Sequence, residues 1–329
     1  MRIFSGIQPT GRKHLGNYIG AIRGYLDGQE RGDPAIYCIV DLHATSVAYD
    51  ADALPDYVLD TAGMLMAAGL DPDRCILFRQ SDVKEHSELC WLLASVTPYG
   101  DLQRMTQFKE KSDRERELVR TSLFLYPVLQ AADILLYKTH QVPVGEDQRQ
   151  HVELSREIAR RFNSTYGEVF VEPEAVIPET GARIMDLQSP ESKMSTTGSN
   201  EAGLVFIDEE PEDIVKKVKR AQTDSGSEVV RGPDKAGISN LIEIYAVTRG
   251  IDPAEVEREF EGQGYGAFKQ SVGEAVAELL APVRERYREL RANPDTIEAA
   301  LRQGAESARE IAVPTMAEVH SVMGLGPRK

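Results

Sequence analysis

A loop with the chemistry of a phosphate site follows the first short apolar run of the sequence. In this loop His14, Gly16 and Asn17 come just before a helical pattern. Unpaired N–H groups and the helix dipole draw an anion to such a position, and a glycine lets a flat ring or a phosphate approach the backbone. An anion site is one interpretation of the loop, and the fragment alone leaves it open. The alternative is a structural turn in which Asn17 only caps the helix.

The same segment superficially matches a P-loop, because four residues separate Gly6 from Gly11. A P-loop places a lysine directly after the second glycine, followed by a serine or threonine that holds magnesium. Arg12 and Lys13 stand at these two positions. The two residues that would carry P-loop chemistry are therefore missing, and we reject this interpretation.

A second candidate loop carries one lysine among small residues. It reads Lys193-Met194-Ser195-Thr196-Thr197. A lysine on such a loop can close over phosphates and neutralise the charge that develops on a leaving group. Lysines in surface loops are common, so this loop gains its weight from the pairing with the His14 loop. Together the two loops favour chemistry on phosphates.

Four polar side chains share one face of a predicted helix. Tyr126, Gln130, Asp133 and Tyr137 recur at helical spacing within a strongly apolar run. A carboxylate in such a run is costly to bury unless a donor meets it. That donor is either part of the protein, as an arginine or a backbone N–H, or it is an N–H or O–H of a substrate. The pattern by itself leaves both readings open.

The elements that must position these residues alternate between strands and helices in the first half of the chain. Apolar runs predict strands at 2–7, 35–40, 76–78 and 141–144, and helical patterns lie at 17–27, 54–68, 85–94, 121–137 and 147–162. This alternation predicts an α/β fold with a Rossmann-type doubly wound parallel sheet. Ligands bind such sheets beyond the carboxyl ends of the strands, where His43 follows a buried strand. We give His43 a pocket-lining role.

The second half changes to a helical pattern. After a loop-like stretch at 188–203, helices are predicted at 212–221, 238–249, 267–291 and 296–313. We therefore expect a smaller all-helical domain, and we divide the chain into residues 1–190 and 191–329.

The composition excludes several classes of protein. Thirty-eight basic and 53 acidic residues give a net charge of −15, which argues against a general affinity for nucleic acid or anionic membranes. Three cysteines without close cysteine or histidine spacing predict neither a disulfide framework nor a structural metal. The sequence shows no signal-peptide core and no apolar run of membrane-spanning length, so we expect a cytoplasmic protein.

Short strings along essentially the whole chain occur in a characteristic order and spacing. They are Phe4-Ser5-Gly6-Ile7-Gln8-Pro9, Gly16-Asn17-Tyr18-Ile19-Gly20, Val40-Asp41-Leu42-His43-Ala44, Arg104-Met105-Thr106-Gln107-Phe108-Lys109, Val142-Pro143-Val144-Gly145-Glu146-Asp147-Gln148, Gly181-Ala182-Arg183-Ile184-Met185, Gly264-Tyr265-Gly266 and Met323-Gly324-Leu325-Gly326. With these strings the chain resembles the class I aminoacyl-tRNA synthetases and, among them, the bacterial tryptophanyl-tRNA synthetase family.

The resemblance implies a two-step reaction. Tryptophan attacks the α-phosphate of ATP, pyrophosphate leaves, and the adenylate passes its acyl group to tRNA. Magnesium arrives bound to ATP, and the family is dimeric, with one tRNA touching both subunits. Catalysis then consists of positioning and of stabilising charge on the phosphates. The catalytic positions that the resemblance implies are Gln8, Thr10, Asn17, Lys111 and Lys193.

The resemblance also implies two sets of binding residues. Those matching ATP-binding positions are Gln8, Pro9, Thr10, His14, Gly16, Asn17, Gly145, Glu146, Asp147, Ile184, Lys193, Met194, Ser195, Thr196 and Thr197. Those matching tryptophan-binding positions are Phe4, His43, Tyr126, Gln130, Asp133, Val142, Val144 and Gln148. The residue that matches Asp133 receives the indole N–H, and Tyr126 helps to hold the α-ammonium group. Asp147 has the alternative role of a helix N-cap.

Two positions differ from the pattern of many family members. At position 14 many bacterial relatives have threonine, whereas His14 matches the wider class. Thr196 stands where a second lysine is usual, so one contact to the departing pyrophosphate is missing. Either Lys193 and Lys111 carry more of this charge, or Arg12 and Lys13 contribute.

Three other functions deserve comparison. The pattern at 126–133 also occurs in tyrosyl-tRNA synthetases, but Phe4 stands where those enzymes meet the substrate phenol with a tyrosine hydroxyl. An adenylyltransferase with a similar first loop is disfavoured by the long helical part. A non-catalytic RNA-binding paralogue would be expected to have damaged ATP loops, and only Thr196 departs. Basic residues at 216–220 and at Arg284, Arg288 and Arg291 are either solvated helix faces or part of a tRNA surface.

Overall fold

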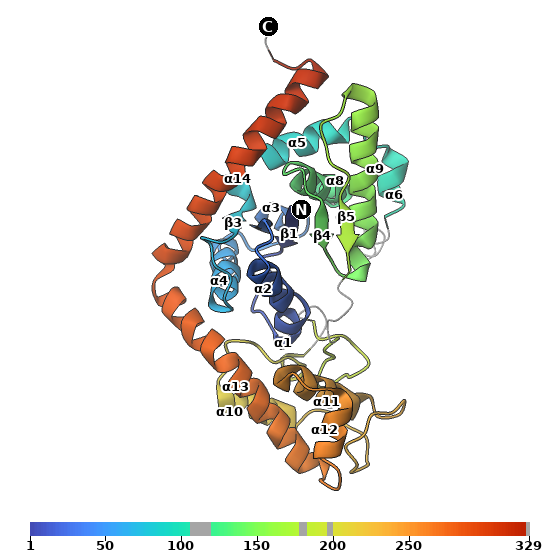
Figure 1. Ribbon diagram of the computed structural model, residues 1–329, viewed down its shortest axis with the longest axis vertical. Helices are drawn as coiled ribbons and strands as arrows, with labels where there is room; N and C mark the ends of the chain where they lie inside the picture. Colours follow the sequence, from blue (N-terminus) through green and yellow to red (C-terminus); the bar gives the residue numbers. More distant parts are fainter. Residues whose placement is uncertain (106–119, 178–182, 196–199, 327–329) are drawn as a thin grey trace.

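Within the part of the chain that the structure describes, five strands form a parallel sheet (Figure 1). The computed structural model describes residues 1–105, 120–177, 183–195 and 200–326. The strands are β1 (Ile3–Ile7), β2 (Ala35–Ile39), β3 (Ile76–Arg79), β4 (Gln141–Pro143) and β5 (Glu174–Val176), in the order β3-β2-β1-β4-β5. An order that grows in both directions from β1 is that of a doubly wound sheet, so the predicted fold class is confirmed. The sequence did not indicate β5, whose three residues are too short to show a pattern.

Alternate residues of β2 face two apolar layers. All five of its residues are buried, Ile36 and Cys38 in one layer and Tyr37 and Ile39 in the other. The first layer is completed by α5 (Glu85–Ala94), α8 (Thr121–Leu135) and α9 (Arg149–Tyr166). The second is completed by α2 (Arg23–Glu30) and α4 (Leu54–Ala67). A strand buried on both faces requires the continuous apolar run that the sequence shows.

Short helical turns follow the carboxyl ends of the strands and carry the polar residues. They are α1 (Leu15–Asn17), a π-helical turn η1 (Tyr18–Ile22), α3 (Asp41–Ala44), η2 (Gln80–Asp82) and η3 (Glu146–Gln148). The first two continue into α2, so the helical run after β1 extends over 15–30, rather than the predicted 17–27. These turns place side chains from distant parts of the sequence together at the carboxyl ends of the strands.

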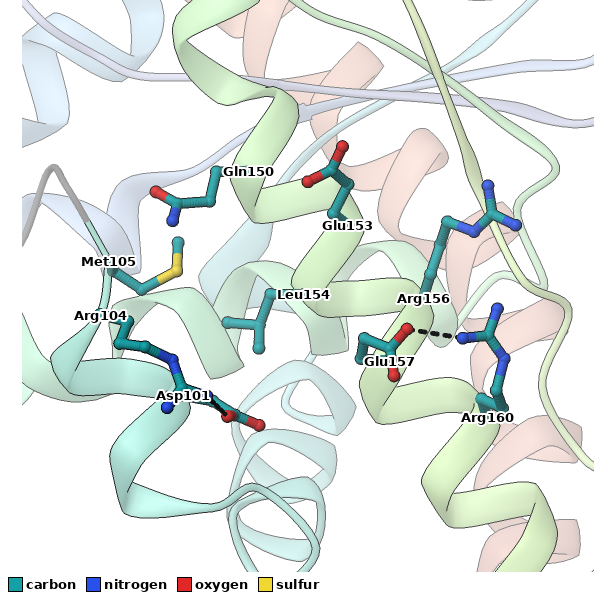
Figure 2. Close-up of a pocket in the computed structure, with 9 residues that line it drawn as sticks. All are labelled: Asp101, Arg104, Met105, Gln150, Glu153, Leu154, Arg156, Glu157 and Arg160. Atoms are coloured by element: carbon teal, nitrogen blue, oxygen red, sulfur yellow. Dashed lines mark hydrogen bonds and ion pairs between the residues drawn. The ribbon is translucent and has the colours of Figure 1, made fainter.

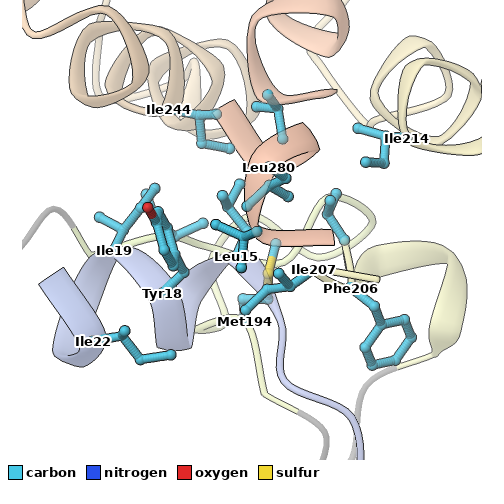
Figure 3. Packing of buried hydrophobic residues seen from close by; sticks show 14 of the residues in the cluster. Leu15, Tyr18, Ile19, Ile22, Met194, Phe206, Ile207, Ile214, Ile244 and Leu280 are labelled. Atoms are coloured by element: carbon cyan, nitrogen blue, oxygen red, sulfur yellow. The ribbon is translucent and has the colours of Figure 1, made fainter. Parts of the chain in front are cut away.

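The second part of the chain is helical, as predicted. It contains the short turn η4 (Glu201–Gly203) and the helices α10 (Pro211–Lys219), α11 (Ala236–Arg249), α12 (Pro253–Glu259) and α13 (Tyr265–Ala292). The short helix α6 (Tyr99–Gln103) belongs to the first part. One apolar cluster joins this part to the start of the first helical run. Figure 3 shows Leu15 and Met194 of this cluster near Phe206 and Leu280. The two parts therefore share buried apolar surface.

The long helix α14 (Pro294–Met323) packs back on the first part of the chain. It lies against β3, α4 and α5, and Figure 1 shows it running along one side of the molecule with α13. The predicted end at residue 313 was wrong, because Pro314 does not stop the helix. A proline removes one backbone hydrogen bond, but Thr315, Met316 and Val319 beyond it are buried, and their packing offsets that loss. The division at residue 190 stays a prediction.

No helix among the described residues is long and apolar enough to cross a membrane.

Candidate active site

The first loop is fixed at its helical end by a capping contact. The backbone N–H of His14 donates to Oδ1 of Asn17 at 3.1 Å, and Asn17 is the third residue of α1. His14 occupies the N-cap position of α1, and the side chain of Asn17 caps the helix from its third position, so a capping role of Asn17 stands beside the proposed anion site. Segment 205–207 flanks the loop, because Leu15 donates to the carbonyl of Val205 at 2.8 Å and Ile207 to that of Lys13 at 3.0 Å. The second part of the chain thus supports the loop directly.

The His14 ring is buried and uncharged. Its Nδ1 atom has no hydrogen-bond partner among the described residues. Burial, followed by the charges of Lys13 and Lys193, lowers the pKa of His14 to about 4. A Cβ on Gly16 would lie 3.1 Å from this ring and 3.5 Å from Cβ of Met194, so the close packing here favours glycine. His14 is thus available as a neutral hydrogen-bonding group.

A cavity of about 260 Å³ lies beside the first loop. Gln8, Thr10, Lys13 and Asn17 are among its lining residues. The Lys13 ammonium donates to the carbonyl of Gln8 at 3.0 Å and to that of Thr10 at 3.5 Å. Burial lowers the pKa of Lys13 to about 8, partly opposed by the nearby Asp60 carboxylate. The loop therefore still holds a cation at neutral pH.

The second loop leaves a short antiparallel pairing. Met185 and Lys193 form a β-bridge, and Met194 donates to the carbonyl of Ile184 at 3.0 Å. The side chain of Asn240 on α11 bonds both the N–H and the carbonyl of Met185, at 2.9 and 3.0 Å. Lys193 is exposed, and its charge acts on His14, so the two loops lie near each other as predicted.

Not every predicted ATP-site residue is open or described. Ile184 and Met194 are buried in the apolar cluster, Pro9 is buried, and Ser195 is partly buried. Lys111, Thr196 and Thr197 lie outside the described residues, and so does the side chain of Asp147.

The third loop follows β4. Gly145 and Glu146 are exposed, and Glu146 accepts from Arg149 at 2.7 Å, which lowers the pKa of Glu146. The helix α9 starts at Arg149 with Gln148 as its N-cap, so Asp147 does not occupy the cap position that the alternative role required.

Asp133 is the centre of a buried polar network. Its exposed fraction is 1%, and three side chains from three elements meet its carboxylate. His43 of α3 contacts Oδ2 at 2.8 Å, whereas Gln80 of η2 and His86 of α5 contact Oδ1 at 2.6 and 2.7 Å. Burial alone would raise the pKa of Asp133, but the hydrogen bonds from His43 and His86 outweigh it and hold the pKa at about 2. The carboxylate is therefore ionised.

These donors were not predicted. The predicted donor to Asp133 was an arginine, a backbone N–H or a substrate, whereas in the structure two histidines and a glutamine contact the carboxylate. Gln80 follows the carboxyl end of β3 in the same way that His43 follows β2, and this signal was available in the sequence. His86 carried no comparable signal, because its helix begins three residues after η2 with no strand before it.

Aromatic rings surround the network. The Tyr137 hydroxyl contacts Nε2 of His86 at 2.7 Å, and Phe4 is buried and stacked on the Tyr137 ring with centroids 5.7 Å apart. Tyr126 contacts Nε2 of His151 at 2.8 Å, and its ring lies edge-on to His43 at 6.4 Å. Of the predicted pocket, the structure thus brings Tyr126, His43 and Asp133 together, whereas Phe4 packs on Tyr137.

The remaining predicted pocket residues lie on α8 and beside β4. Gln130 of α8 is partly buried, Val142 of β4 is buried, and Val144 and Gln148 beyond β4 are partly buried.

A larger cavity, of about 420 Å³, lies elsewhere, between α6 and α9 (Figure 2). Several of its charged side chains pair with each other, as Arg104 does with Asp101 and Arg160 with Glu157, both at 2.5 Å. None of the predicted site residues lines it.

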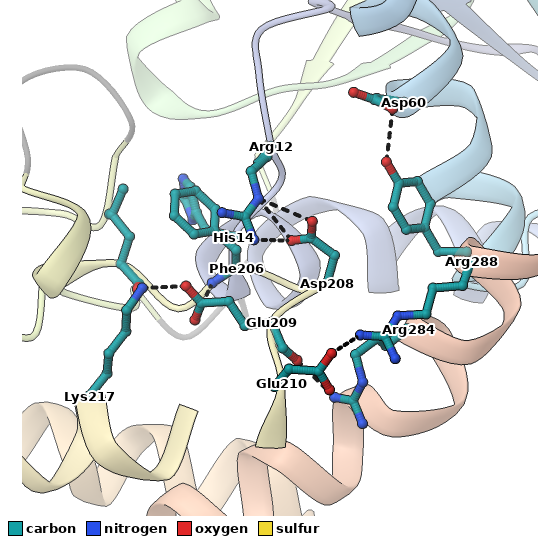
Figure 4. Close-up of polar contacts among 12 residues, drawn as sticks. Arg12, His14, Asp60, Phe206, Asp208, Glu209, Glu210, Lys217, Arg284 and Arg288 are labelled. Atoms are coloured by element: carbon teal, nitrogen blue, oxygen red, sulfur yellow. Dashed lines mark hydrogen bonds and ion pairs between the residues drawn. The ribbon is translucent and has the colours of Figure 1, made fainter. Parts of the chain in front are cut away.

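Three arginines on one face of α13 contact neighbouring segments. Figure 4 shows Arg284 and Arg288 next to segment 208–210. Arg284 donates to the carbonyl of Glu209 at 3.1 Å, Arg288 pairs with Glu210, and Arg291 pairs with Asp60 of α4 at 2.8 Å. These arginines thus join α13 to neighbouring segments. Arg288 does so from an exposed position, as a solvated helix face would have it, and a role of this face in a tRNA surface stays a prediction.

Among the described residues, no group of three or more histidine, cysteine, aspartate or glutamate side chains is arranged to hold a metal ion.

Known proteins are similar to this chain in sequence and in architecture. The family model described as class I tRNA synthetases (W and Y) matches residues 1–281. Tryptophan–tRNA ligase 1 of Streptomyces coelicolor is 47% identical over 99% of this chain and 98% of its own length. Tryptophan–tRNA ligase of Wolinella succinogenes is 47% identical over 98% of each chain. A solved structure of tryptophanyl-tRNA synthetase from Campylobacter jejuni, complexed with ADP and tryptophan, superposes with a TM-score of 0.86 at 35% identity, covering 99% of this chain and 100% of that one.

Proposed function

The chain belongs to the class I tRNA synthetases of the tryptophan and tyrosine family, and on this premise we propose that it is a tryptophan–tRNA ligase. It activates L-tryptophan with ATP and transfers the tryptophanyl group to tRNA. The observation that carries the proposal at the site is the buried, ionised Asp133 carboxylate at the edge of the sheet where the ATP loops begin. Such a carboxylate is an acceptor for a substrate N–H in an apolar pocket.

The activation step needs charge stabilisation at the phosphates. The carboxylate of tryptophan attacks the α-phosphorus, and the bond to the β,γ-pyrophosphate breaks as negative charge builds on the leaving group. We assign Lys193 and Lys111 to that charge, and Gln8, Thr10 and Asn17 to holding the triphosphate. The neutral His14 ring and the Lys13 cation support this assignment, since both lie at the same loop. Mg²⁺ is proposed to arrive on the ATP phosphates.

The other ATP contacts are assigned by position. The loop after β4 supplies Gly145, Glu146 and Asp147, and the second loop supplies Ser195, Thr196 and Thr197. Ile184 and Met194 form the adenine side. Both are buried in the apolar cluster that includes Leu15, so this side of the site must open to admit a base.

Tryptophan is favoured over tyrosine by the chemistry around Asp133. Tyr126, Gln130 and Gln148 are assigned to the polar part of the amino acid, and Val142 and Val144 to the ring. Phe4 offers no hydroxyl to a phenol, and its ring supports the pocket from the core through Tyr137.

A second copy of the chain is proposed as a partner. Trp91 of α5 and Tyr99 of α6 are 76% and 65% exposed, and Tyr99 packs on Phe124 of α8 with ring centroids 5.0 Å apart. Aromatic residues are more frequent in protein interfaces than on the rest of a protein surface. We propose a homodimer that covers them.

We further propose that the helical part meets the anticodon of tRNA and that the enzyme works in the cytoplasm.

Amino-acid-dependent ATP–pyrophosphate exchange tests the function. The purified chain is assayed with Mg²⁺ and either tryptophan or tyrosine. Exchange with tryptophan alone is expected. Exchange with tyrosine alone would keep the chemistry and overturn the specificity, whereas a folded protein silent with both would favour the non-catalytic RNA-binding paralogue.

A further inference from the structure

The two oxygens of Asp133 are used unequally. Oδ1 accepts from both Gln80 and His86, whereas His43 is the one donor to Oδ2 among the residues that the structure describes. A carboxylate oxygen has two lone-pair positions. Oδ1 is therefore fully used by the protein, and Oδ2 keeps one position. Because the His43 ring lies beside Tyr126, Oδ2 is the oxygen on the side of the proposed tryptophan pocket.

Both donors to Oδ1 are themselves held at their far ends. Oε1 of Gln80 accepts from the backbone N–H of Leu42 at 3.1 Å, which fixes the amide so that its NH₂ faces Asp133. Nε2 of His86 meets the Tyr137 hydroxyl at 2.7 Å. Gln80, His86 and Tyr137 are each fully buried. The Asp133 carboxylate is thus held from behind by side chains that cannot turn freely.

The hydroxyl of Tyr137 selects one form of His86. Burial, then the nearby Cys38 and Asp133, raises the pKa of Tyr137 well above its ordinary value, so the hydroxyl keeps its proton. It can therefore donate to Nε2, and Nδ1 then carries the N–H that faces Oδ1. A histidine whose second nitrogen is engaged presents the first in a fixed tautomer and orientation.

We propose that Gln80, His86 and Tyr137 are positioning residues that hold Oδ1 of Asp133 so that the remaining lone pair of Oδ2 is aimed at the ring N–H of tryptophan. This inference rests on the proposed function and deepens it. The same arrangement disfavours a phenol. A phenol oxygen also needs a donor, and the N–H groups with which His43 and His86 face this site already donate to the carboxylate. A buried acceptor left without a partner is penalised.

The test compares tryptophan with β-(3-benzothienyl)alanine, in which sulfur replaces the ring N–H. Exchange kinetics are measured for the full chain and for His86→Leu, which removes the donor, and His86→Asn, whose amide can still donate to Oδ1. For the unmodified chain, kcat/KM is expected to favour tryptophan by on the order of 100-fold. In His86→Leu, the KM for tryptophan should rise and the preference should fall, each by about tenfold, with kcat changed by less than about twofold. His86→Asn should stay within about threefold of the unmodified chain.

Two controls separate positioning from structure. Phe162→Leu alters the apolar layer of α9 without touching the network, and it should lower the melting temperature with the preference unchanged. Gln80→Met, the second variant, should lose the preference as His86→Leu does and decides the question if His86→Leu does not fold.

The outcomes are distinct. Unchanged preference in a folded His86→Leu or Gln80→Met, or loss in His86→Asn equal to that in His86→Leu, would overturn the positioning role alone. An unmodified chain without tryptophan-dependent exchange would overturn the proposed function together with it.

Discussion

His14 keeps an uncharged ring at the start of α1, and this has a consequence for stability against acid. Its pKa in the folded protein is about 4, below the ordinary value of 6.5. Between these values the unfolded chain binds a proton that the folded chain does not. The contribution of the neutral His14 ring to the free energy of unfolding is therefore fully present above about pH 6.5, and it is lost as the pH falls toward 4.

Replacing His14 should flatten this part of the acid response. In His14→Gln, the loss of unfolding free energy between about pH 6.5 and about pH 4 should be smaller than in the unmodified chain by up to roughly 3 kcal/mol. Urea unfolding at several pH values measures it. His320→Gln, at a partly exposed ring on α14, is the control and should follow the unmodified chain. Equal acid sensitivity in His14→Gln and the control would contradict the prediction.

Thr196 offers a test of catalytic charge. Restoring the usual lysine with Thr196→Lys adds a second cation near Lys193, and one added contact to the departing pyrophosphate should raise kcat for exchange by about tenfold. The KM for tryptophan should not change. Initial-rate kinetics at varied tryptophan and ATP separate the two, and a large rise in the tryptophan KM would rule out this role.

Single residues also show where sequence reasoning reaches its limit. The apolar residues around Asp133 in the sequence predicted a buried carboxylate that requires hydrogen-bond donors, and the spacing along α8 predicted Tyr126 on the same helix face. The partners His86 and Gln80 come from other elements, and only the folded sheet brings them to the carboxylate. Phe4 was predicted to line the tryptophan pocket, and the structure shows it stacked on the buried Tyr137 ring. Residues two positions apart on a strand face the same layer, so the sequence alone does not show which of them contacts the substrate.

At the scale of elements, α14 depends on one close approach. A Cβ on Gly304 would come within 1.9 Å of the carbonyl oxygen of Leu77 on β3, and Leu77 cannot move without disturbing the sheet. Ala305, Ala308 and Ala312 on the same helix are buried. Small residues thus let α14 lie directly on the edge strand.

Gly304→Ala should therefore be destabilising, although alanine favours helices. The free energy of unfolding should fall by about 2–4 kcal/mol, because the added methyl group forces the helix away from β3. Gly24→Ala is the matched control, since Gly24 is a helical glycine with nothing within 4 Å of the added Cβ; it should be neutral or slightly stabilising. Denaturant unfolding of both variants decides, and equal stability would refute the close-approach argument.

The elements themselves were largely predictable, and their ends were not. The continuous apolar run of β2 and the helical periodicities of α4, α5 and α13 predicted these elements within a few residues. The end of α14 was missed because Pro314 is a local signal for termination, and the opposing signal is burial of Val319 against distant helices. Local propensity and tertiary packing conflict there, and packing prevails.

At the scale of the whole molecule, a net charge of −15 is compatible with ordered basic residues because many of these pair with acidic neighbours. Arg12 pairs with Asp208 at 2.8 Å and lies over the Phe206 ring, and Lys217 pairs with Glu209. The Arg12–Asp208 pair connects the first loop to the second part of the chain, and the Lys217–Glu209 pair lies within that second part. Basic side chains used in this way are less available to a polyanion, so a tRNA surface must draw on others.

The proposed dimer gives a prediction at this scale. Light scattering on the eluted protein should give about twice the chain mass of 36.5 kDa. Trp91→Glu should shift the protein toward the monomer, because a charge replaces a large apolar contact at the proposed interface. Val230→Glu, at an apolar side chain in the helical part that is 39% exposed, should remain dimeric. A monomeric unmodified chain would refute the dimer, and a dimeric Trp91→Glu would refute this surface.

The return of α14 to β3 also orders events during synthesis of the chain. The ribosome delivers β3 and α5 long before α14, so the side of the sheet that this helix covers stays bare while the intervening residues are translated. In the nascent chain, Phe78 and Leu89 belong to a layer that lacks its last helix. Folding of the sheet is therefore completed late, and the growing polypeptide presents an apolar surface of the kind that chaperones bind.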